Sequence, residues 1–514
     1  MSMSDKPAAE FHNSITLDAD KCKGCINCIK RCPTQAIRVR NGKALILTER
    51  CIDCGECIRV CQNHAKLPVH HRLPEIDKYK YKVALPAPAL YGQFNRLNDI
   101  DILLNALFLY GFDDVFEVAK AAEIVSDRTR FLMEEDGDMP RPIINSSCPA
   151  VVKLIRVRFP GLVRNLLRLN APVELAARMA VRKALADRPG LSRGDVGVIF
   201  ISPCAAKMTA VRNPFCVERS EVDAVIAIKD IYPHLLPLMK AVVQKGEESM
   251  PMLLGSGRMG VSWCGSGGES GALLSESYLA ADGVESVIKV LEDLEDEKLG
   301  DLDFIELNAC SAGCVGGVLT VENPYVAITR LKKLRRFLPV SMNHFTNGEK
   351  ALIEWETQPG ALQALELSDD YSLALERASR MKDIAARLPG LDCGSCGAPT
   401  CASLAEDVVR GEADDADCIY KLRDYVQNLI RDMVKLECYI PPPFRKPPVD
   451  GKGDGEGEAE GETEGEAEGE GECEDEDEGG TRTRRGAGEG NGDTRTRHGA
   501  GEGNGDTRTR PIDT

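Results

Sequence analysis

The stretch Phe304-Ile-Glu-Leu-Asn-Ala-Cys-Ser-Ala-Gly-Cys-Val-Gly-Gly317 guides the interpretation of the rest of the chain. A short apolar run ends here in two cysteines four positions apart, Cys310 and Cys314, and glycines surround the second one. Thiolates are the usual ligands of iron–sulfur clusters, and residues four apart lie on one face of a helical turn. The stretch is therefore expected to bring two cluster ligands together. The alternative is a pair of buried structural cysteines ahead of a helix.

Two earlier stretches carry further cysteines. Asn145-Ser-Ser-Cys-Pro149 holds Cys148, and Ser202-Pro-Cys-Ala-Ala-Lys207 holds Cys204 at the end of an apolar run. In order and in their wide separation, the three stretches resemble the signature segments of the iron-only, or FeFe, hydrogenase domain. That family's patterns read T-S-C-C-P, M-P-C-x-x-K and E-x-M-A-C-x-x-G-C-x-x-G-G. The resemblance spans residues 79–367, and three matches in order are far more specific than one.

The resemblance implies a complete cofactor, the H-cluster, at these stretches. A 4Fe–4S cubane would be held by Cys148, Cys204, Cys310 and Cys314. By the same resemblance, Cys314 would also bridge to a two-iron subcluster that carries CO, cyanide and an azadithiolate and that splits or forms H2. Lys207 would donate to a cyanide ligand, since a buried lysine needs an anionic partner. The alternative for Lys207 is an ordinary solvated side chain.

Several positions depart from the family pattern. The family's proton-relay cysteine falls at Ser147, its methionines near the two-iron unit fall at Ser202 and Asn308, and a glutamate that usually follows the lysine falls at Ala210. A thiol titrates near 8.5, whereas an alcohol does not ionise usefully near neutrality, so we expect poorer proton transfer through Ser147. The resemblance thus implies Lys207 and Ser147 as catalytic residues, and Ser202, Asn308 and Gly317 as cofactor contacts.

Residues 1–78 contain two cysteine runs with the spacing of a bacterial two-cluster ferredoxin. In that pattern the fourth cysteine of each run binds the other cluster. The spacing therefore predicts one 4Fe–4S cluster at Cys22, Cys25, Cys28 and Cys61, and a second at Cys32, Cys51, Cys54 and Cys57. A zinc site would instead use cysteine pairs separated by a longer gap. The proline that usually follows the last cysteine is replaced by Gln62.

A third cysteine group follows a stretch of helical character at 361–388. Its spacing, Cys-x2-Cys-Gly-x3-Cys-x16-Cys, resembles a small 4Fe–4S module of electron-transfer and corrinoid iron–sulfur proteins, and zinc is the alternative. The ligands implied are Cys393, Cys396, Cys401 and Cys418. Residues 423–436 then predict an amphipathic helix suited to pairing with a partner, a homodimer included. Four remaining cysteines are interpreted as ordinary thiols: Cys216, Cys264, Cys438 and Cys473.

Between the cysteine groups, strands are expected to alternate with helices. Apolar runs predict strands at 81–88, 196–201, 222–228 and 304–307, and helical spacing predicts helices at 98–110, 150–159 and 173–186. This alternation indicates an α/β domain, with Cys204 and Cys310 at strand ends, where active groups are expected. A glycine-rich stretch at 255–271 lacks the Gly-Lys-Ser/Thr of a phosphate loop. In the hydrogenase family a G-x-x-G-G segment lies here beside the cluster.

The predicted organisation has four parts. They are an α+β two-cluster ferredoxin domain at 1–78, an α/β H-cluster domain at 79–370, a small helical four-cysteine 4Fe–4S domain at 371–440, and a Pro-rich linker with a disordered acidic and glycine-rich tail at 441–514. The tail contains a perfect repeat at 486–497 and 499–510. It has almost nothing apolar to bury, so it is expected to stay disordered.

The net charge of −17 is concentrated in the tail. Residues 450–514 carry 21 acidic against eight basic residues, which leaves −4 for residues 1–449. No basic stripe suggests nucleic-acid binding, no apolar run is long enough for a membrane span, and the polar start of the chain does not resemble a signal peptide. With 20 cysteines mostly in metal-type spacings, these features predict a protein of the reducing cytoplasm.

The resemblance and its departures together imply a slow FeFe-hydrogenase. We expect it to interconvert H2 and protons at the H-cluster and to relay electrons through three accessory 4Fe–4S clusters to a redox or signalling partner. The departures resemble the sensory branch of the family, group D, which also ends in a four-cysteine cluster domain. The alternative is a non-catalytic Narf-like protein that holds only a cubane, although such relatives typically have fewer N-terminal cluster ligands. A catalytic hydrogenase with another proton path is a third interpretation.

Overall fold

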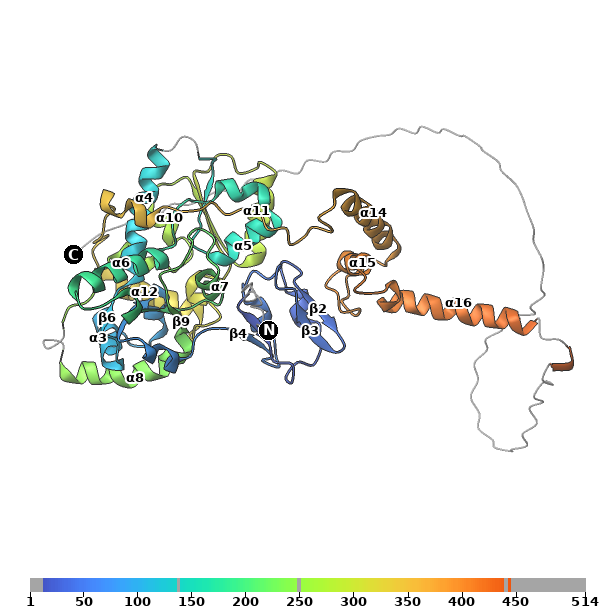
Figure 1. Ribbon diagram of the computed structural model, residues 1–514, viewed down its shortest axis with the longest axis horizontal. Coiled ribbons are helices and arrows are strands. Elements are labelled where there is room, and N and C mark those ends of the chain that lie inside the picture. The colour runs from blue at the N-terminus through green and yellow to red at the C-terminus, as the bar shows by residue number, and fades with distance from the viewer. Residues whose placement is uncertain (1–12, 136–138, 247–250, 439–441, 445–514) are drawn as a thin grey trace, which may run out of the picture. The chain divides into compact units, whose positions relative to one another are not determined.

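A computed structural model describes residues 13–135, 139–246, 251–438 and 442–444 of the chain (Figure 1). Contacts divide the chain into two units, 1–439 and 440–514, and nearly all of the described residues belong to the first. The predicted domain boundaries at 78 and 370 lie inside this first unit and stay predictions. The predicted disordered tail lies outside the described residues, apart from a single turn, η10 (Pro442–Phe444). Among the described helices, none is long and apolar enough to cross a lipid bilayer.

The N-terminal cluster region, residues 13–78, is built from two similar halves. Strand β1 (Ile15–Leu17) pairs antiparallel with β4 (Lys66–Pro68), and β2 (Ile37–Arg40) pairs antiparallel with β3 (Lys43–Ile46). One-turn helices α1 (Asn27–Lys30) and α2 (Glu56–Arg59) lie within the two cysteine runs. The core of this region consists largely of small apolar side chains and cysteines. Metal ligation would therefore supply much of its stability.

The central region, residues 79–370, contains two parallel sheets. The four-stranded sheet has the order β6 (Asp114–Val115), β5 (Tyr81–Pro86), β8 (Val196–Ser202) and β9 (Ala224–Ala227). The three-stranded sheet has the order β10 (Tyr278–Asp282), β11 (Phe304–Asn308) and β7 (Ile143–Ile144). Every residue of β8 and β11 is buried. Their near-continuous apolar sequences are typical of parallel strands that are covered on both faces.

Helices cover both sheets, so strands and helices alternate as predicted. They are α3 (Ile100–Tyr110), α4 (Val118–Glu135), α5 (Pro149–Arg158), α6 (Pro172–Asp187), α7 (Ala206–Arg212), α8 (Ile228–Lys245), α9 (Arg258–Ser262), α10 (Gly268–Ala272), α11 (Val284–Glu295), α12 (Pro324–Leu334) and α13 (Lys350–Ile353). The termini of these helices follow local rules. Asp99, for example, caps α3 by accepting a hydrogen bond from the Asp101 amide, and Gly111 ends it in the left-handed conformation.

The C-terminal cluster module, residues 371–438, is helical. It contains α14 (Tyr371–Arg387), α15 (Cys401–Arg410) and α16 (Ile419–Cys438). The predicted helix at 361–388 is wrong in its first ten residues, because the Asp370 side chain accepts a hydrogen bond from the Leu373 amide and starts α14 there. The predicted helix at 423–436 is part of the longer α16, whose side chains from 422 to 436 are all exposed.

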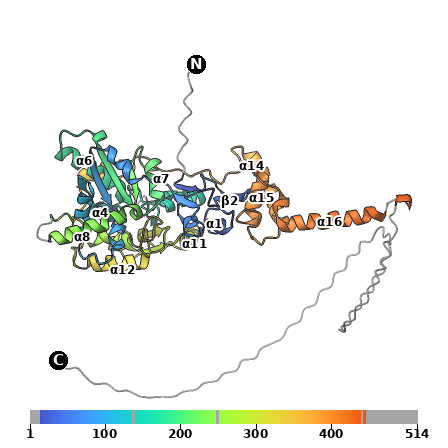
Figure 2. The ribbon, with the colours of Figure 1, turned by 90° about the horizontal axis from the view of Figure 1, so that it is seen from below.

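The N-terminal cluster region contacts both other parts of this unit. Arg59 donates to the carbonyl of Gly316 in the central region at 2.6 Å. On another side, the Val39 amide donates to the carbonyl of Gly397 in the C-terminal module at 2.7 Å. Figures 1 and 2 both show α15 beside β2, in agreement with this contact. The cysteines of the ferredoxin-type runs therefore lie in a region that touches the other two cysteine groups.

Candidate metal centres

Four cysteines of the central region converge at the ends of its strands. Cys148 caps α5 just after β7, Cys204 follows β8, and Cys310 and Cys314 follow β11. Burial raises the pKa of the Cys310 thiol well above its usual range, and the neighbouring Cys204, Cys148 and Cys314 raise it further. Mutual effects of this kind require the four thiols to be close together. The structure thus brings together the four residues that the signature segments single out.

The turn between Cys310 and Cys314 is not the helical turn that the spacing of four predicts. Ala312 and Gly313 both have positive φ angles, 64° and 84°, which an α-helix does not allow. Gly313 forms a β-bridge with Gly265 of the glycine-rich stretch, where a Cβ atom would come within 2.7 Å of the Cys264 carbonyl oxygen. Cys264, interpreted above as an ordinary thiol, is buried beside this turn.

Gly317 holds the loop after Cys314 against the loop of Cys204. The Leu319 amide donates to the Pro203 carbonyl at 3.0 Å, and a Cβ atom on Gly317 would lie 2.0 Å from that same oxygen. No side chain fits there, so glycine is required for the close approach. Gly317 therefore positions two of the four cysteines relative to each other.

These thiols need a positive partner to be ionised. Burial and the neighbouring cysteines raise the pKa of Cys204 to about 11, despite the opposing effect of Lys207, and burial raises that of Cys314 to about 12. Iron ions supply the positive charge that a coordinating thiol requires to lose its proton. Among the described residues no three side chains are arranged around a single metal ion, an arrangement that a cluster of several irons does not need. The donor set fits an iron–sulfur cluster.

Lys207 lies beside this group of cysteines on α7. Its ammonium donates to the Ser147 carbonyl oxygen at 2.8 Å, and its side chain is half-buried. The position agrees with a role at the cluster more than with a solvated surface lysine. Ser202 is fully buried, and its hydroxyl bonds both the amide and the carbonyl of Cys204 at 3.1 and 3.0 Å. Ser202 therefore braces a ligand loop.

A buried pair of carboxylates next to Ser147 was missed by the sequence reasoning. Oε2 of Glu269 accepts hydrogen bonds from the Ser147 hydroxyl and from the Asn145 amide nitrogen, both at 2.9 Å. Burial raises the pKa of Glu269, and the negative charge of nearby Glu306 raises it further. A sequence signal did exist, because Glu269 is an acid among glycines and Glu306 fills the glutamate position of the third signature pattern.

Glu306 accepts more hydrogen bonds than Glu269 does. Its carboxylate accepts hydrogen bonds from the Gly267 amide, from the Ser270 amide and hydroxyl, and from the Asn308 side chain, at 2.8–3.0 Å. Burial still raises the pKa of Glu306. The four donors stabilise the charged form of Glu306 and oppose the effect of burial on its pKa, whereas burial and the charge of Glu306 together raise the pKa of Glu269. The Asn308 side chain therefore stabilises the Glu306 carboxylate by a hydrogen bond.

In the N-terminal cluster region the structure brings together both predicted sets of cysteines. Burial raises the pKa of Cys28, Lys66 opposes the rise, and Cys25, Cys22 and Cys61 add to it. The second set surrounds a cavity in the region, lined by Cys32, Cys51, Cys54 and Cys57. The crossed assignment of the fourth cysteines thus agrees with the contacts.

The four cysteines of the C-terminal module lie around its small core. Burial raises the pKa of Cys396, and Cys393 and Cys418 raise it further. Cys401 opens α15 directly after its cap Thr400, and with Cys396 it packs against the small buried core that contains Cys418. These four cysteines are close enough to be candidate ligands of one cluster.

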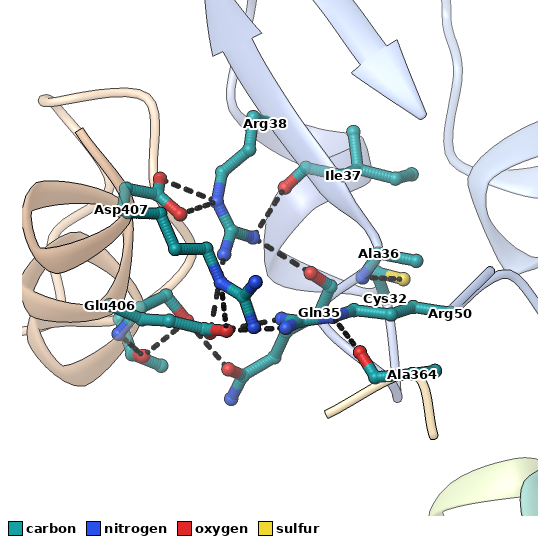
Figure 3. A network of polar contacts seen from close by, with 12 residues as sticks. Cys32, Gln35, Ala36, Ile37, Arg38, Arg50, Ala364, Glu406 and Asp407 are labelled. Atoms are coloured by element: carbon teal, nitrogen blue, oxygen red, sulfur yellow. Dashed lines mark hydrogen bonds and ion pairs between the residues drawn. The ribbon is translucent and has the colours of Figure 1, made fainter. Parts of the chain in front are cut away.

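Charged side chains join the C-terminal module to the N-terminal region (Figure 3). Nε of Arg38 donates to both carboxylate oxygens of Asp407, at 2.9 and 2.6 Å, and both side chains are 2% exposed. Arg40 adds a bond to Asp407 at 2.5 Å. Beside this pair, Arg50 binds Glu406 and holds the pKa of that carboxyl below its usual value against the effect of burial. The contact is buried and highly complementary in charge.

Comparison with known protein families gives three matches in separate parts of the chain. Residues 80–278 match the family described as "Iron only hydrogenase large subunit, C-terminal domain", and residues 14–62 match "4Fe-4S dicluster domain". Residues 388–420 match a family described as an Fe-S cluster domain. The matches fall within the central region, the N-terminal region and the C-terminal module.

Individual relatives agree with these families. The chain is 25% identical over 380 residues to the HndD subunit of an NADP-reducing hydrogenase from Solidesulfovibrio fructosivorans, covering 59% of this chain and 64% of that subunit. It is 28% identical over 99 residues to a NAR1 homologue, a cytosolic Fe-S cluster assembly factor of Schizosaccharomyces japonicus, covering 19% of each chain.

A solved structure of a variant FeFe-hydrogenase HydA1 from Chlamydomonas reinhardtii matches with 18% identity and a TM-score of 0.40, covering 55% of this chain and 94% of that one. The family matches and the hydrogenase relative agree with the cysteine geometry described above. Residues 80–278 are therefore iron-only hydrogenase-like, with a match to a dicluster ferredoxin-type domain before them and a match to an Fe–S cluster domain after them.

Proposed function

We propose that this chain is an FeFe-hydrogenase-type oxidoreductase that activates H2 reversibly and slowly, in a sensory or regulatory role. The observation that supports this most strongly is the convergence of four cysteines at strand ends, with Lys207 and the Glu269–Glu306 pair beside them. A purely structural cubane needs the four thiolates. It does not need a buried acid that holds a proton next to the ligand loop of Cys148.

The cofactor we propose is the H-cluster, which supplies the chemistry of H2 cleavage when it is bound. Cys148, Cys204, Cys310 and Cys314 would hold it. Lys207 is placed to stabilise negative charge in the site, because its ammonium already lies at the Ser147 carbonyl. The protein's own work is therefore to orient the cofactor, to balance its charge and to deliver protons.

Proton transfer would run through Ser147, Glu269 and Glu306. The Ser147 hydroxyl can pass a proton by accepting one from Glu269 and releasing its own, because it is both donor and acceptor. A carboxyl whose pKa is raised by burial is a better acid near neutrality than an ordinary glutamate. The hydroxyl at 147 remains a poor acid, which supports slow turnover.

Electrons would travel through the N-terminal cluster region. Its second cysteine run adjoins the central site, since Arg59 binds the carbonyl of Gly316, two residues after Cys314. Its segment around β2 adjoins the C-terminal cysteines, since Arg40 donates to the Cys396 carbonyl at 3.1 Å. We therefore propose three accessory 4Fe–4S clusters in series with the central site, with the C-terminal cluster at the outer end.

The surface of α16 offers a partner site for the proposed regulatory role. Six of its apolar side chains recur at alternating spacings of three and four: Ile419, Leu422, Val426, Leu429, Met433 and Leu436. These six side chains are exposed by between 47%, at Val426, and 65%, at Leu436. β-Branched residues at the first heptad position, here Ile419 and Val426, with leucine at the fourth favour parallel two-stranded coiled coils, and Met433 holds the third first position. A second copy of the chain is therefore the proposed partner.

The second candidate function is a non-catalytic iron–sulfur protein that holds only a cubane at the central site. The short similarity to a NAR1 homologue supports it. The two candidates differ in one feature, the two-iron subcluster, and in its consequence, turnover of H2. The paired carboxylates at Ser147 favour the hydrogenase, because a cubane that only binds or transfers electrons has no use for a proton route.

Iron content and H2 turnover test the proposal together. The full chain is reconstituted anaerobically and compared before and after treatment with the maturation machinery. Sixteen cysteines in four sets predict about 16 irons before maturation and about 18 after it. H2-dependent dye reduction should appear only in the matured sample and should be absent from Cys314→Ala. About 16 irons after maturation, with no H2 turnover, would favour the cubane-only function.

A further inference from the structure

The two halves of the N-terminal cluster region have the same local structure after their last cysteine, but they differ in one residue there. Each half continues Cys-x3-Ala, at Cys32–Ala36 and at Cys61–Ala65, and the alanine amide donates to the cysteine sulfur at 3.2 Å in both. The residue before each alanine has a positive φ, 52° and 49°. The next residue is Ile37 in one half and Lys66 in the other.

Lys66 therefore occupies the buried position that holds the aliphatic Ile37 in the other half. Ile37 is 2% exposed and lines the cavity that is surrounded by Cys32, Cys51, Cys54 and Cys57. Lys66 is 3% exposed, and its ammonium has no hydrogen-bond partner among the described residues. Burying an ammonium without a partner is costly. An anionic group beside it would remove that cost.

Lys66 lies next to the first ferredoxin-type set, because the amide of the preceding Ala65 donates to the Cys61 sulfur at 3.2 Å. Burial raises the pKa of Cys28, and Lys66 makes the largest opposing contribution. Lys66 also acts on Cys22 of the same set and on Cys57 of the other. A 4Fe–4S cluster bound by four thiolates is an anion, and the positions of these sulfurs make it the partner that the buried ammonium requires.

We propose that Lys66 raises the reduction potential of the cluster held by Cys22, Cys25, Cys28 and Cys61. That potential would then lie above the potential of the second ferredoxin-type cluster, which has Ile37 in the equivalent position. This rests on the proposed cluster ligands and not on H2 chemistry. Reduction adds one electron and one negative charge to a cluster, and a fixed positive charge at close range favours the reduced form. The electron passes from the cluster beside Ile37, which is oxidised, to the cluster beside Lys66, which is reduced. No proton is involved.

The proposed difference in potential biases the direction of electron flow. The cluster of Cys32, Cys51, Cys54 and Cys57 lies on the side of the central site, through α2 and the Arg59 contact. An electron that leaves the central site would therefore come to rest on the cluster beside Lys66. The pair would then act as a one-electron store.

Redox titration of the full, reconstituted chain, followed by electron paramagnetic resonance, tests the inference. In Lys66→Met, the equilibrium constant for reduction of one cluster should fall about tenfold or more, which is about 59 mV for one electron. Lys66→Arg should keep the native potential. The matched control is Lys43→Met, since Lys43 also lies near Cys22 but is exposed, with its ammonium bound to the Ala19 and Cys22 carbonyls. Its potentials should change by less than about threefold in that constant.

Iron content checks that each variant is loaded. Full loading of Lys66→Met with unchanged potentials would overturn the inference and leave the hydrogenase proposal intact. If Lys66→Met does not load, the reverse variant Ile37→Lys decides. It should raise the potential of the other cluster, and an unchanged potential there would overturn the inference.

Discussion

Replacing Asp407 by asparagine should loosen the C-terminal module from the N-terminal region. The change keeps the shape of the side chain and removes the charge that Arg38 and Arg40 bind. Arg38 and Asp407 are each 2% exposed, so the variant leaves a buried guanidinium without its carboxylate. Breaking a buried pair in this way typically costs about 3–5 kcal/mol.

The structure places the expected cost at the lower end of that range. Arg38 would keep hydrogen bonds to the carbonyls of Gln35 and Ile37, at 2.7 and 3.4 Å, and it would still lie 3.9 Å from Glu406. We expect about 3 kcal/mol, which corresponds to more than a hundredfold change in the equilibrium between docked and released module.

Hydrogen exchange at the Val39 amide measures this equilibrium directly. That amide donates to the Gly397 carbonyl across the contact, so it exchanges when the module opens. Exchange should accelerate about a hundredfold in Asp407→Asn. The control is Glu285→Gln, which removes the exposed ion pair with Arg31 and should cost less than about 1 kcal/mol. Unchanged exchange at Val39 in Asp407→Asn would refute the assignment of this network as the docking contact.

Four further predictions concern the proton route and the partner surface. Glu269→Gln should lower H2 turnover about 10²-fold or more with the iron content unchanged, whereas Glu174→Gln, at a buried carboxylate bound to Ser220, should not. The folded-state pKa of Glu269 is raised from 4.5, so the stability that its proton contributes is present below about pH 4.5 and is lost as the pH rises through the raised pKa. The melting temperature measured as a function of pH should show this loss, and Glu269→Gln should remove it. Ser147→Cys should raise turnover by less than about 10²-fold, since a thiol is the better acid; no gain with full iron content would mean that protons enter another way. Leu429→Asp should convert a dimer into a monomer by light scattering, and Asn428→Asp, with the same added charge on the adjacent position of α16, should not; a native monomer would contradict the coiled-coil proposal.

The strands and the cysteine groups could be predicted because their signals are local. The buried runs ending at Ser202 and Asn308 are apolar in sequence, and the spacing of the cysteines is dictated by cluster geometry. The start of the helix predicted at 361–388 was wrong, because the helical pattern of the sequence runs through Asp370. The Asp370 carboxylate caps the helix and so sets its first residue at Tyr371. The turn at Cys310 was misjudged because a spacing of four is equally compatible with two residues of positive φ.

The contacts that give the site its chemistry are not local. Ser147 and Glu269 are 122 positions apart, and Arg38 and Asp407 are 369 apart. No periodicity links such residues, and each is unremarkable in its own stretch. Lys66 is an intermediate case, because comparison of the two ferredoxin-type halves already shows it opposite Ile37, while its burial without a partner appears only in the fold.

The infrared spectrum of the matured chain tests the central claim most directly. Bands of CO and cyanide bound to iron should appear after maturation, and Lys207→Met should shift the cyanide bands while the cubane content stays unchanged. The same spectrum should be absent before maturation and in Cys314→Ala. A fully loaded, matured chain without CO or cyanide bands would contradict the assignment of an H-cluster and leave a cubane-only iron–sulfur protein.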